Sequence, residues 1–263
     1  GWNSTIGKVN YYLKGIYAFN RNKVIEKSEA AKPYPYMYEA GLPIKQFIGY
    51  QYDGFFSSYD EIASSPQQFG LTNLKPGDIK YKDINGDGIV DENDQAPIGY
   101  STVPEMTYSL QLGASYKGFD VSVMFQGAAR SSVYLYQDLG WDNMTGNYYE
   151  EHINRWTPET AATATYPRFL QGSKESHQNY YLSDFWLKDG KYLRLKNVMI
   201  SYTFDKKMLR KTPFSSLKIF ASGFNLITWD KLKKVDPEVA PSSNTGYFYP
   251  QQRQYNMGIN VSF

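Results

Sequence analysis

The sequence predicts an all-β fold, in which antiparallel up-and-down strands form the C-terminal segment of a transmembrane β-barrel with long extracellular loops and one short helix. Three observations support this prediction. Several runs of residues alternate between apolar and polar side chains, as strands with two different faces do. The clearest run reaches the last residue and ends on an aromatic side chain. Short turns and long connections also alternate along the chain, which is typical of outer-membrane barrels.

The composition narrows the class of protein further. The chain has 263 residues and a net charge of +2, so its charge indicates no nucleic-acid partner. It contains no cysteine, which excludes disulfides and thiolate metal sites, and no apolar run approaches the roughly 20 residues that a membrane helix needs. Aromatic residues make up 17% of the chain. Such a surplus would suit aromatic girdles at the membrane interfaces, or a surface that stacks on sugar rings.

The first quarter of the chain is predicted to hold two strands and the helix. Alternation from Val9 to Phe19 predicts one strand, and a second is expected over Ile44 to Asp53. The segment between them is rich in proline and tyrosine and is expected to be an ordered loop. Ser58 precedes Glu61 by three residues, a capping pattern that predicts a short helix ending before Pro66.

An acidic loop within residues 78–94 matches the twelve-residue pattern of calcium-binding loops. Oxygen-bearing side chains stand at loop positions 1, 3, 5, 9 and 12, glycine at position 6 allows the sharp turn, and position 7 offers its backbone carbonyl. The predicted calcium ligands are Asp83, Asn85, Asp87, Ile89, Asp91 and Asp94. Proline and glycine on both sides exclude long flanking helices, so we expect a structural calcium site and not a calcium switch. The alternative is a polar turn that binds no metal.

The clearest pair of strands follows this loop. Two alternating runs are joined by the minimal turn Lys117-Gly118, and both are aromatic at their ends. Their apolar residues are Tyr108, Leu110, Leu112, Ala114 and Tyr116 in the first run, and Phe119, Val121, Val123 and Phe125 in the second. Such a hairpin is expected on the periplasmic side of a barrel.

Residues 127–183 form a long polar connection that is rich in tyrosine and tryptophan. Connections of this length are usually functional in compact domains. Its aromatic residues are candidates for contact with a ligand or partner, namely Trp141, Tyr148, Tyr149 and Trp156. His152 and His177 also lie here, and we expect both to be solvated. Since no nucleophile, paired-carboxylate or phosphate-loop pattern accompanies them, the sequence indicates no enzyme.

Three further strands are expected in the last third of the chain. They cover residues Tyr192 to Phe204, Leu217 to Gly223, and Gln251 to Phe263. If Lys117-Gly118 faces the periplasm, strict up-and-down order places the short connections in the periplasm and the long ones outside the cell, the acidic loop included. The long connections are then 127–191 and 226–248. The 20–43 segment fits poorly, because it is long for a periplasmic turn.

A set of short motifs follows one order along the chain. They are Asp53-Gly54-Phe55-Phe56, Lys75-Pro76-Gly77-Asp78 ahead of the acidic loop, Tyr116-Lys117-Gly118-Phe119-Asp120, Phe125-Gln126-Gly127-Ala128, Arg155-Trp156-Thr157-Pro158, Tyr192-Leu193-Arg194-Leu195, Gly223-Phe224-Asn225-Leu226 and Asp236-Pro237-Glu238. Together they resemble the C-terminal part of SusC/RagA-type TonB-dependent outer-membrane transporters. The resemblance covers most of the chain.

The resemblance implies a plugged barrel of about 22 strands in the outer membrane of a Gram-negative bacterium. It implies import of glycan or peptide nutrients, energised by TonB through an N-terminal box, with a SusD-like surface lipoprotein as partner and outer-membrane lipid around the barrel. The plug, the TonB box and most strands are absent from this sequence. About seven strands are expected here, too few to close such a barrel. Residues 1–263 are therefore expected to be the C-terminal part of a longer receptor.

One alternative function stays open on the sequence alone. A secreted β-module, stabilised by calcium, could bind carbohydrate through its loop aromatics. Aromatic residues of a membrane girdle should instead lie at strand ends, as Tyr108, Tyr116, Phe119 and Phe125 do. Transport is therefore the leading expectation.

Overall fold

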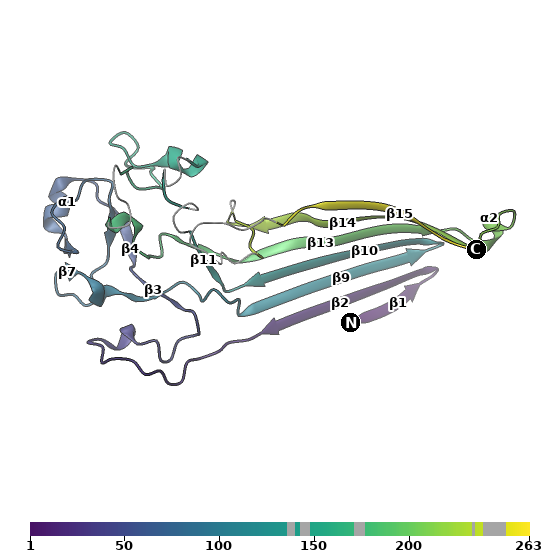
Figure 1. Ribbon diagram of the computed structural model, residues 1–263, viewed down its shortest axis with the longest axis horizontal. Helices are drawn as coiled ribbons and strands as arrows, with labels where there is room; N and C mark the ends of the chain where they lie inside the picture. Colours follow the sequence, from purple (N-terminus) through teal and green to yellow (C-terminus); the bar gives the residue numbers. More distant parts are fainter. Residues whose placement is uncertain (136–139, 143–147, 171–176, 233–234, 239–250) are drawn as a thin grey trace.

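The computed structural model is an elongated molecule with a long sheet and a head of short elements at one end of it (Figure 1). It describes residues 1–135, 140–142, 148–170, 177–232, 235–238 and 251–263. We use "head" for the described parts of residues 20–105 and 130–191, the two long connections between strands of the sheet. The predicted 226–248 loop begins too early, because residues 226–230 continue the strand Ser216–Asp230; the remainder of that loop is described only at residues 231–232 and 235–238.

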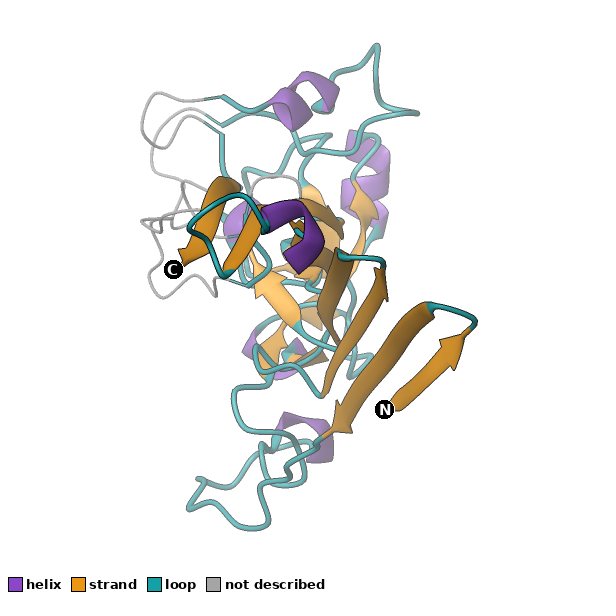
Figure 2. Ribbon diagram, turned by 90° about the vertical axis from the view of Figure 1, so that its right-hand side faces the viewer, coloured by secondary structure: helices purple, strands orange, loops and turns teal. Residues whose placement is uncertain are grey.

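Across the described ranges the sheet has seven strands, and every neighbouring pair is antiparallel. In spatial order they are β1 (Trp2–Ile6), β2 (Val9–Phe19), β9 (Met106–Tyr116), β10 (Phe119–Ala129), β13 (Tyr192–Thr203), β14 (Ser216–Asp230) and β15 (Gln254–Ser262). This is also their order along the chain, as expected for up-and-down strands. Within the described residues β1 and β15 are unpaired edges, and Figure 2 shows these two ends of the sheet lying apart. The sheet is therefore not closed.

The sheet leaves large apolar side chains in contact with solvent. In β15, for example, Met257 is 88% exposed and Ile259 is 64% exposed, and Val121, Ile200 and Ile219 of other strands are exposed as well. They belong to the apolar rows that the alternation predicted. An uncovered apolar surface over several strands is unusual for a soluble monomer.

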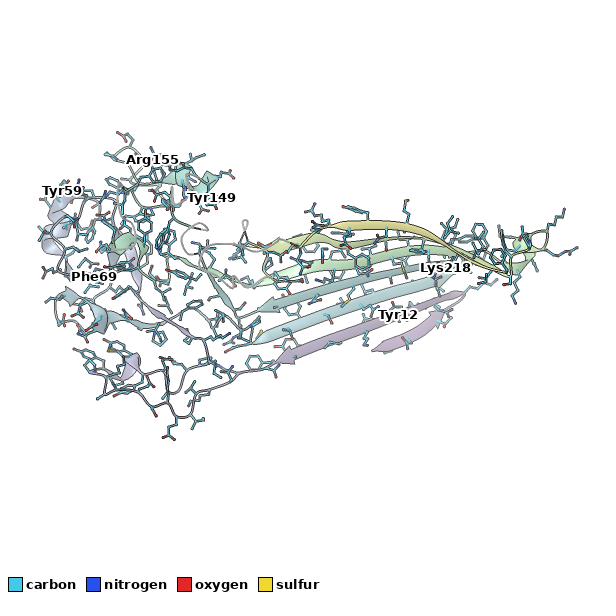
Figure 3. All side chains as sticks on the ribbon, viewed as in Figure 1. Tyr12, Tyr59, Phe69, Tyr149, Arg155 and Lys218 are labelled. Atoms are coloured by element: carbon cyan, nitrogen blue, oxygen red, sulfur yellow. The ribbon has the colours of Figure 1, made fainter. Side chains whose placement is uncertain are left out.

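On the polar face, aromatic rings lie over glycines of neighbouring strands. Tyr12 of β2 is the register partner of Gly113 of β9. A Cβ atom on Gly113 would lie 2.2 Å from Cε1 of Tyr12, so only glycine accommodates the ring in this position. Tyr12 lies in the middle of the sheet, far from the head (Figure 3). Gln111 Nε2 also donates to the Tyr12 hydroxyl at 3.2 Å, over a sequence separation of 99 residues. The two contacts of Tyr12 together fix the register between β2 and β9.

One predicted strand of the sheet is wrong. The 44–53 segment forms β3 (Phe47–Gly49) and the start of β4 (Tyr52–Phe55), which pair inside the head with β8 (Ala96–Ile98) and β6 (Ile79–Tyr81). The missing place in the sheet is taken by β1, which alternation did not predict. Residues 20–105 are therefore one connection, located at the same end as 130–191. The 20–43 segment is therefore the start of this long connection at the head end. It is not a periplasmic turn, and its length no longer conflicts with the predicted topology.

The head consists of short strands and helical turns. Besides β3, β4, β6 and β8 it holds η1 (Pro35–Met37), α1 (Tyr59–Ser64), β5 (Gln67–Gln68), β7 (Ile89–Val90), η2 (Glu92–Asp94), β11 (Ser132–Tyr134), η4 (Glu150–Asn154), η5 (Gln178–Tyr180) and β12 (Leu187–Asp189), while α2 (Lys206–Leu209) lies at the far end of the sheet. The predicted cap is confirmed, because the Ser58 side chain accepts a hydrogen bond from the Glu61 backbone at 3.1 Å. No helix in the described part of the chain is long and apolar enough to cross a membrane.

The core of the head is largely aromatic. Its buried cluster consists of Tyr50, Ile79, Tyr81, Val90, Trp141, Tyr166, Tyr180 and Trp186. The cluster draws on both long connections, so neither can form this core without the other. Side chains are crowded in the head and sparse along the sheet (Figure 3). Many of the aromatic residues that could have served a girdle or a sugar-binding surface are thus used to pack the head.

Candidate functional site

The acidic loop of residues 83–94 is closed by its own carboxylates. Asp83 accepts hydrogen bonds from two backbone amides, that of Gly86 at 2.7 Å and that of Gly88 at 2.8 Å. Asp87 accepts from the Ile89 amide at 2.9 Å, and its own amide donates to the Asn85 side chain at the same distance. These side chains therefore turn inward along the loop, because short acidic side chains readily bond nearby backbone donors.

Asp94 holds the two ends of the loop together. It is completely buried. One carboxylate oxygen accepts from the amides of Ile84 at 2.6 Å and Asn85 at 3.3 Å, and the other accepts from the Asp91 amide at 2.9 Å. Asp91 in turn caps η2 by accepting from the Asn93 amide at 2.7 Å. The loop thus has a defined shape that depends on its first, ninth and twelfth positions.

The electrostatic environment of the loop is negative. Tyr36, from the first long connection, donates its hydroxyl hydrogen to the Asn93 carbonyl at 2.6 Å. Burial raises the pKa of Tyr36, and the nearby carboxylates of Asp94, Asp83 and Asp87 raise it further. A negative field of this kind favours a cation in the loop.

The loop residues carry the ligand atoms that calcium prefers, but their side chains are not arranged around a common point. The five predicted side-chain ligands would coordinate through oxygen atoms, which Ca²⁺ prefers, and all of them lie within the twelve residues 83–94. Across the described residues, however, no group of three or more His, Cys, Asp or Glu side chains is gathered as a metal centre. The carboxylates point instead to the backbone amides named above. The calcium site therefore stays a prediction.

A second polar cluster, which no local pattern in the sequence predicted, lies inside the head around Asp78. Asp78 is fully buried and pairs with Arg168, whose Nε lies 2.7 Å from Oδ1. Asp78 also accepts from the Asn179 side chain at 2.9 Å and from the Lys75 amide at 2.8 Å. The one sequence signal was the aspartate directly after Pro76-Gly77 in the family-like motif, but its side-chain partners Arg168 and Asn179 lie 90 and 101 residues away.

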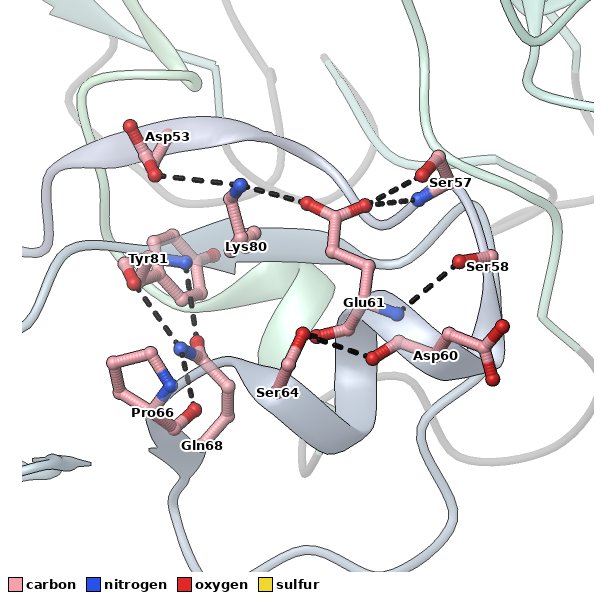
Figure 4. A network of polar contacts seen from close by, with 10 residues as sticks. All are labelled: Asp53, Ser57, Ser58, Asp60, Glu61, Ser64, Pro66, Gln68, Lys80 and Tyr81. Carbon is pink, nitrogen blue, oxygen red and sulfur yellow. Dashed lines mark hydrogen bonds and ion pairs between the residues drawn. The ribbon is translucent and has the colours of Figure 1, made fainter.

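A third cluster joins α1 to β6 at the surface of the head (Figure 4). Lys80 Nζ lies 2.8 Å from Glu61 Oε1 and 3.5 Å from Asp53 Oδ2. Glu61 also accepts from the Ser57 hydroxyl at 2.6 Å and the Ser57 amide at 2.8 Å. The hydrogen bonds from Lys80 and Ser57 lower the pKa of Glu61 to about 2.

The four predicted contact aromatics do not form one surface. Trp141 is 2% exposed and packs against Tyr180 with ring centroids 4.6 Å apart, so a ligand could reach it only if the core opened. Trp156 is half-buried, with its indole packed over Gly77. Tyr149 is half-buried beside η4, and Tyr148 alone of the four is largely exposed, at 56%. Ligand or partner contact stays a prediction, best suited to Tyr148.

The expectation of solvated histidines is wrong. His152 is 2% exposed, and its Nδ1 accepts from the Tyr149 amide at 3.1 Å. The side chain of His177 is 13% exposed, and burial lowers its pKa. Both histidines are structural parts of the head. Burial came from tertiary packing around isolated polar positions, for which the sequence carries no local signal.

The head is attached to the sheet through a buried carboxylate. Glu105, directly before β9, is 6% exposed and lies between Arg130 at 2.7 Å and Arg21 at 3.0 Å. The backbones meet here too, since the Asn20 amide donates to the Glu105 carbonyl at 2.8 Å. The ends of β2, β9 and β10 are thereby tied together where the chain enters the head.

A comparable tie holds the connection after β14 to the sheet. Arg194 of β13 is 2% exposed and lies 2.7 Å from Asp236 and 3.0 Å from Glu238. Lys196 lies 2.6 Å from the same Glu238, so both cations project from one face of the sheet. A register shift between Leu195 and Asn197 lets the apolar row continue on the other face with Val198.

The sequence comparisons identify relatives for most of the chain. No family model matches it. Over 237 residues, covering 85% of the chain, it is 29% identical to TonB-dependent receptor P26 of Formosa agariphila, and over 227 residues, covering 82%, it is 23% identical to TonB-dependent receptor SusC of Bacteroides thetaiotaomicron. It spans 23% and 20% of the lengths of these two receptors.

The structural comparison agrees with these relatives. The RagAB peptide importer in its "open-open" state superposes with a TM-score of 0.71 at 20% identity, covering 98% of this chain and 27% of the matched one. This chain is related to the SusC/RagA-type TonB-dependent receptors. The resemblance predicted from the motifs is confirmed, and so is the fold class. The fold is therefore similar to part of the barrel of that importer, with the seven-stranded sheet as a piece of antiparallel barrel wall and the head as two long connections at one end of it.

Proposed function

We propose that this chain is part of a TonB-dependent importer of nutrients in the outer membrane of a Gram-negative bacterium. The observation that carries this proposal is the sheet. In the part of the chain that the structure describes, it has seven antiparallel strands in chain order, an exposed apolar face, and two unpaired edges that further strands would extend. Lipid would cover the apolar face, and a closed barrel would pair the edges.

The arrangement of connections supports an orientation in the membrane. The turns Gly7-Lys8 and Lys117-Gly118 and the α2 segment lie at one end of the sheet, and the head lies at the other (Figure 1). In outer-membrane barrels, short turns face the periplasm and long loops face outward. The head would therefore face the outside of the cell, where it could contact a SusD-like surface lipoprotein and the incoming nutrient. TonB would energise import through the full-length receptor; this chain spans 23% of the length of its matched relative P26.

The relatives support import but leave the class of nutrient to experiment. One matched structure is described as a peptide importer, whereas the other relatives are described only as TonB-dependent receptors or SusC. We propose glycan or peptide fragments as cargo. A strain lacking the gene should lose growth or uptake on one of these nutrient classes and recover it when the full-length gene is restored. Unchanged uptake of both classes would contradict the import function.

Cell fractionation tests the membrane location independently of the cargo. An antibody against the peptide of residues 247–263 should detect a band in the outer membrane that is several times larger than this chain. A band of 30.2 kDa in the soluble fraction would instead support the alternative of a secreted carbohydrate-binding module.

We further propose that the acidic loop binds calcium as a structural ion. The side chains that would hold it are Asp83, Asn85, Asp87, Asp91 and Asp94, together with the Ile89 carbonyl. The oxygen-bearing side chains of the loop and the raised pKa of Tyr36, to which the nearby carboxylates contribute, support a cation there. Bound calcium would neutralise the carboxylates and hold the loop against β5, with which β7 of the loop already pairs. The side chain of Gln68 in β5 in turn donates to the Tyr81 carbonyl of β6.

A further inference from the structure

The end of the sheet opposite the head carries a concentrated positive charge. Three connections meet there, and they contain six cations: Lys8, Lys117, Lys206, Lys207, Arg210 and Lys211. The only carboxylate within these connections is Asp205, which caps α2 by accepting from the Lys207 amide at 3.0 Å. By contrast, the whole chain has a net charge of only +2. We call these six residues the basic rim.

None of the six cations of the basic rim forms an ion pair within the described residues. All six side chains are exposed, and within the described residues none lies at ion-pair distance from a carboxylate. Lys206 and Arg210, and likewise Lys207 and Lys211, are four residues apart. Like charges at this spacing destabilise a helical turn. No described ion pair therefore accounts for the cluster, although Lys117 lies over the Tyr116 ring at 5.2 Å, and an external anion would relieve the repulsion.

An aromatic belt lies directly beside the basic rim. The rings of Phe119 and Tyr202 are 4.5 Å apart, those of Tyr202 and Phe204 are 5.0 Å apart, and those of Phe214 and the C-terminal Phe263 are 5.5 Å apart. Tyr202 also donates to the Met208 sulfur of α2 at 3.8 Å, which ties the basic turn to the strand. Beyond this belt the apolar face of the sheet begins.

This order of apolar face, aromatic belt and cations matches the profile of one bilayer leaflet. Hydrocarbon covers apolar side chains, aromatic rings lie at the headgroup level, and lysine and arginine reach the phosphates. We propose that the basic rim binds the anionic headgroups of glycerophospholipids in the leaflet at the short-turn end of the barrel. The inference rests on the proposed membrane location of the sheet. It adds a lipid preference that import alone does not require.

The test uses the full-length receptor that contains this sequence, purified in mixed micelles with phosphatidylglycerol or with phosphatidylcholine of the same acyl chains. Native mass spectrometry counts the lipids that each sample retains. The wild type should retain phosphatidylglycerol preferentially. In the variant K206Q/K207Q/R210Q/K211Q, the ratio of retained phosphatidylglycerol to phosphatidylcholine should fall at least roughly fivefold. A single cation near an anionic surface is expected to contribute about this much.

Two controls separate charge from folding and from location. The variant K23Q/K27Q/K32Q/K45Q removes the same number of cations from the head and should keep the preference, as should K206R/K207R/K211R, which preserves the charge. If the quadruple rim variant does not assemble, K207Q/K211Q is measured in its place. Equal retention of phosphatidylglycerol by the wild type and the rim variant would overturn the lipid inference while leaving import intact. A wild type that retains neither lipid and fractionates as a soluble protein would overturn the membrane location itself.

Discussion

Asp78 and Arg168 are 90 residues apart in sequence and form an ion pair inside the head, with Nε at 2.7 Å from Oδ1 and Nη2 donating to Oδ2 at 3.1 Å. Each belongs to a different long connection between strands of the sheet. The pair therefore joins the two halves of the head at a point that water does not reach on the aspartate side, since Asp78 is fully buried.

Replacing Arg168 by methionine should destabilise the head strongly. The substitution leaves the Asp78 carboxylate buried without its cation, a change that costs about 3–5 kcal/mol in other proteins. The measurement is the urea concentration at which the head of the full-length receptor becomes sensitive to protease. Lys27→Met serves as a control, because its ion pair with Glu39 is exposed on both sides and should contribute little. Equal midpoints for both variants would contradict the structural role of the pair.

Calcium should protect the head against thermal unfolding, and Asp83→Ala combined with Asp87→Ala should abolish that protection. Glu92→Ala is the matched control, since Glu92 lies in the same loop at a position that is not a predicted ligand. If the double variant kept its calcium-dependent shift, the proposed site would be wrong.

Replacing Asp94 by alanine should lower the thermal stability of the head even when a chelator removes calcium. Its carboxylate accepts from three backbone amides, which Asp94→Ala would leave without this acceptor. These amides are half-buried and water can replace part of the lost bonding, so we expect a total loss of about 1–3 kcal/mol. The same melting experiment in excess chelator distinguishes this structural role from metal binding, because Asp83→Ala with Asp87→Ala should have a smaller effect there.

Arginine at Val121 or Ile259 should impair assembly of the barrel. Both side chains lie on the apolar face, and arginine near the bilayer midplane costs about 2–4 kcal/mol in outer-membrane barrels. Ser122→Arg, on the opposite face of β10, is the matched control. The readout is the amount of folded receptor in the outer membrane, followed by its heat-dependent mobility in gels. Normal assembly of the Val121 and Ile259 variants would exclude a lipid-facing position for these residues.

The contact between α1 and β6 should weaken in acid. Lys80 and Ser57 lower the pKa of Glu61 from 4.5 to about 2. A group with a depressed folded-state pKa stabilises the protein above its unfolded pKa, and this stabilisation is lost as the pH falls from about 4.5 towards 2. Hydrogen exchange of residues 59–64 should therefore accelerate in that interval, and the acceleration should be much smaller in Glu61→Gln. Glu39→Gln, which makes the same charge change elsewhere in the head, is the control and should keep the wild-type acceleration. If Glu61→Gln also accelerated as much as the wild type, titration of Glu61 would not be the cause.

Local patterns in the sequence determined much of the fold. Alternation predicted β2, β9, β10, β13 and β15, since a strand between two different environments must alternate whatever its neighbours are. The Ser58 cap was equally predictable, because its partner Glu61 lies three residues away. The acidic loop could be found in the same way, as its ligand pattern lies within twelve residues, although its metal is still a proposal.

Only the tertiary structure decided which extended segments join the sheet and which side chains are buried. Residues 44–53 have strand character, but their hydrogen-bond partners come from β6 and β8, so they belong to the head. Trp141 looked like a contact residue in a polar connection, yet it packs in the core with Tyr180, and Asp78 meets Arg168 only because two long connections fold together. Alternation and composition indicate whether a segment favours a strand and which of its faces favours an apolar environment. The partner that satisfies those preferences is chosen by packing between segments far apart in the chain, which no local pattern encodes.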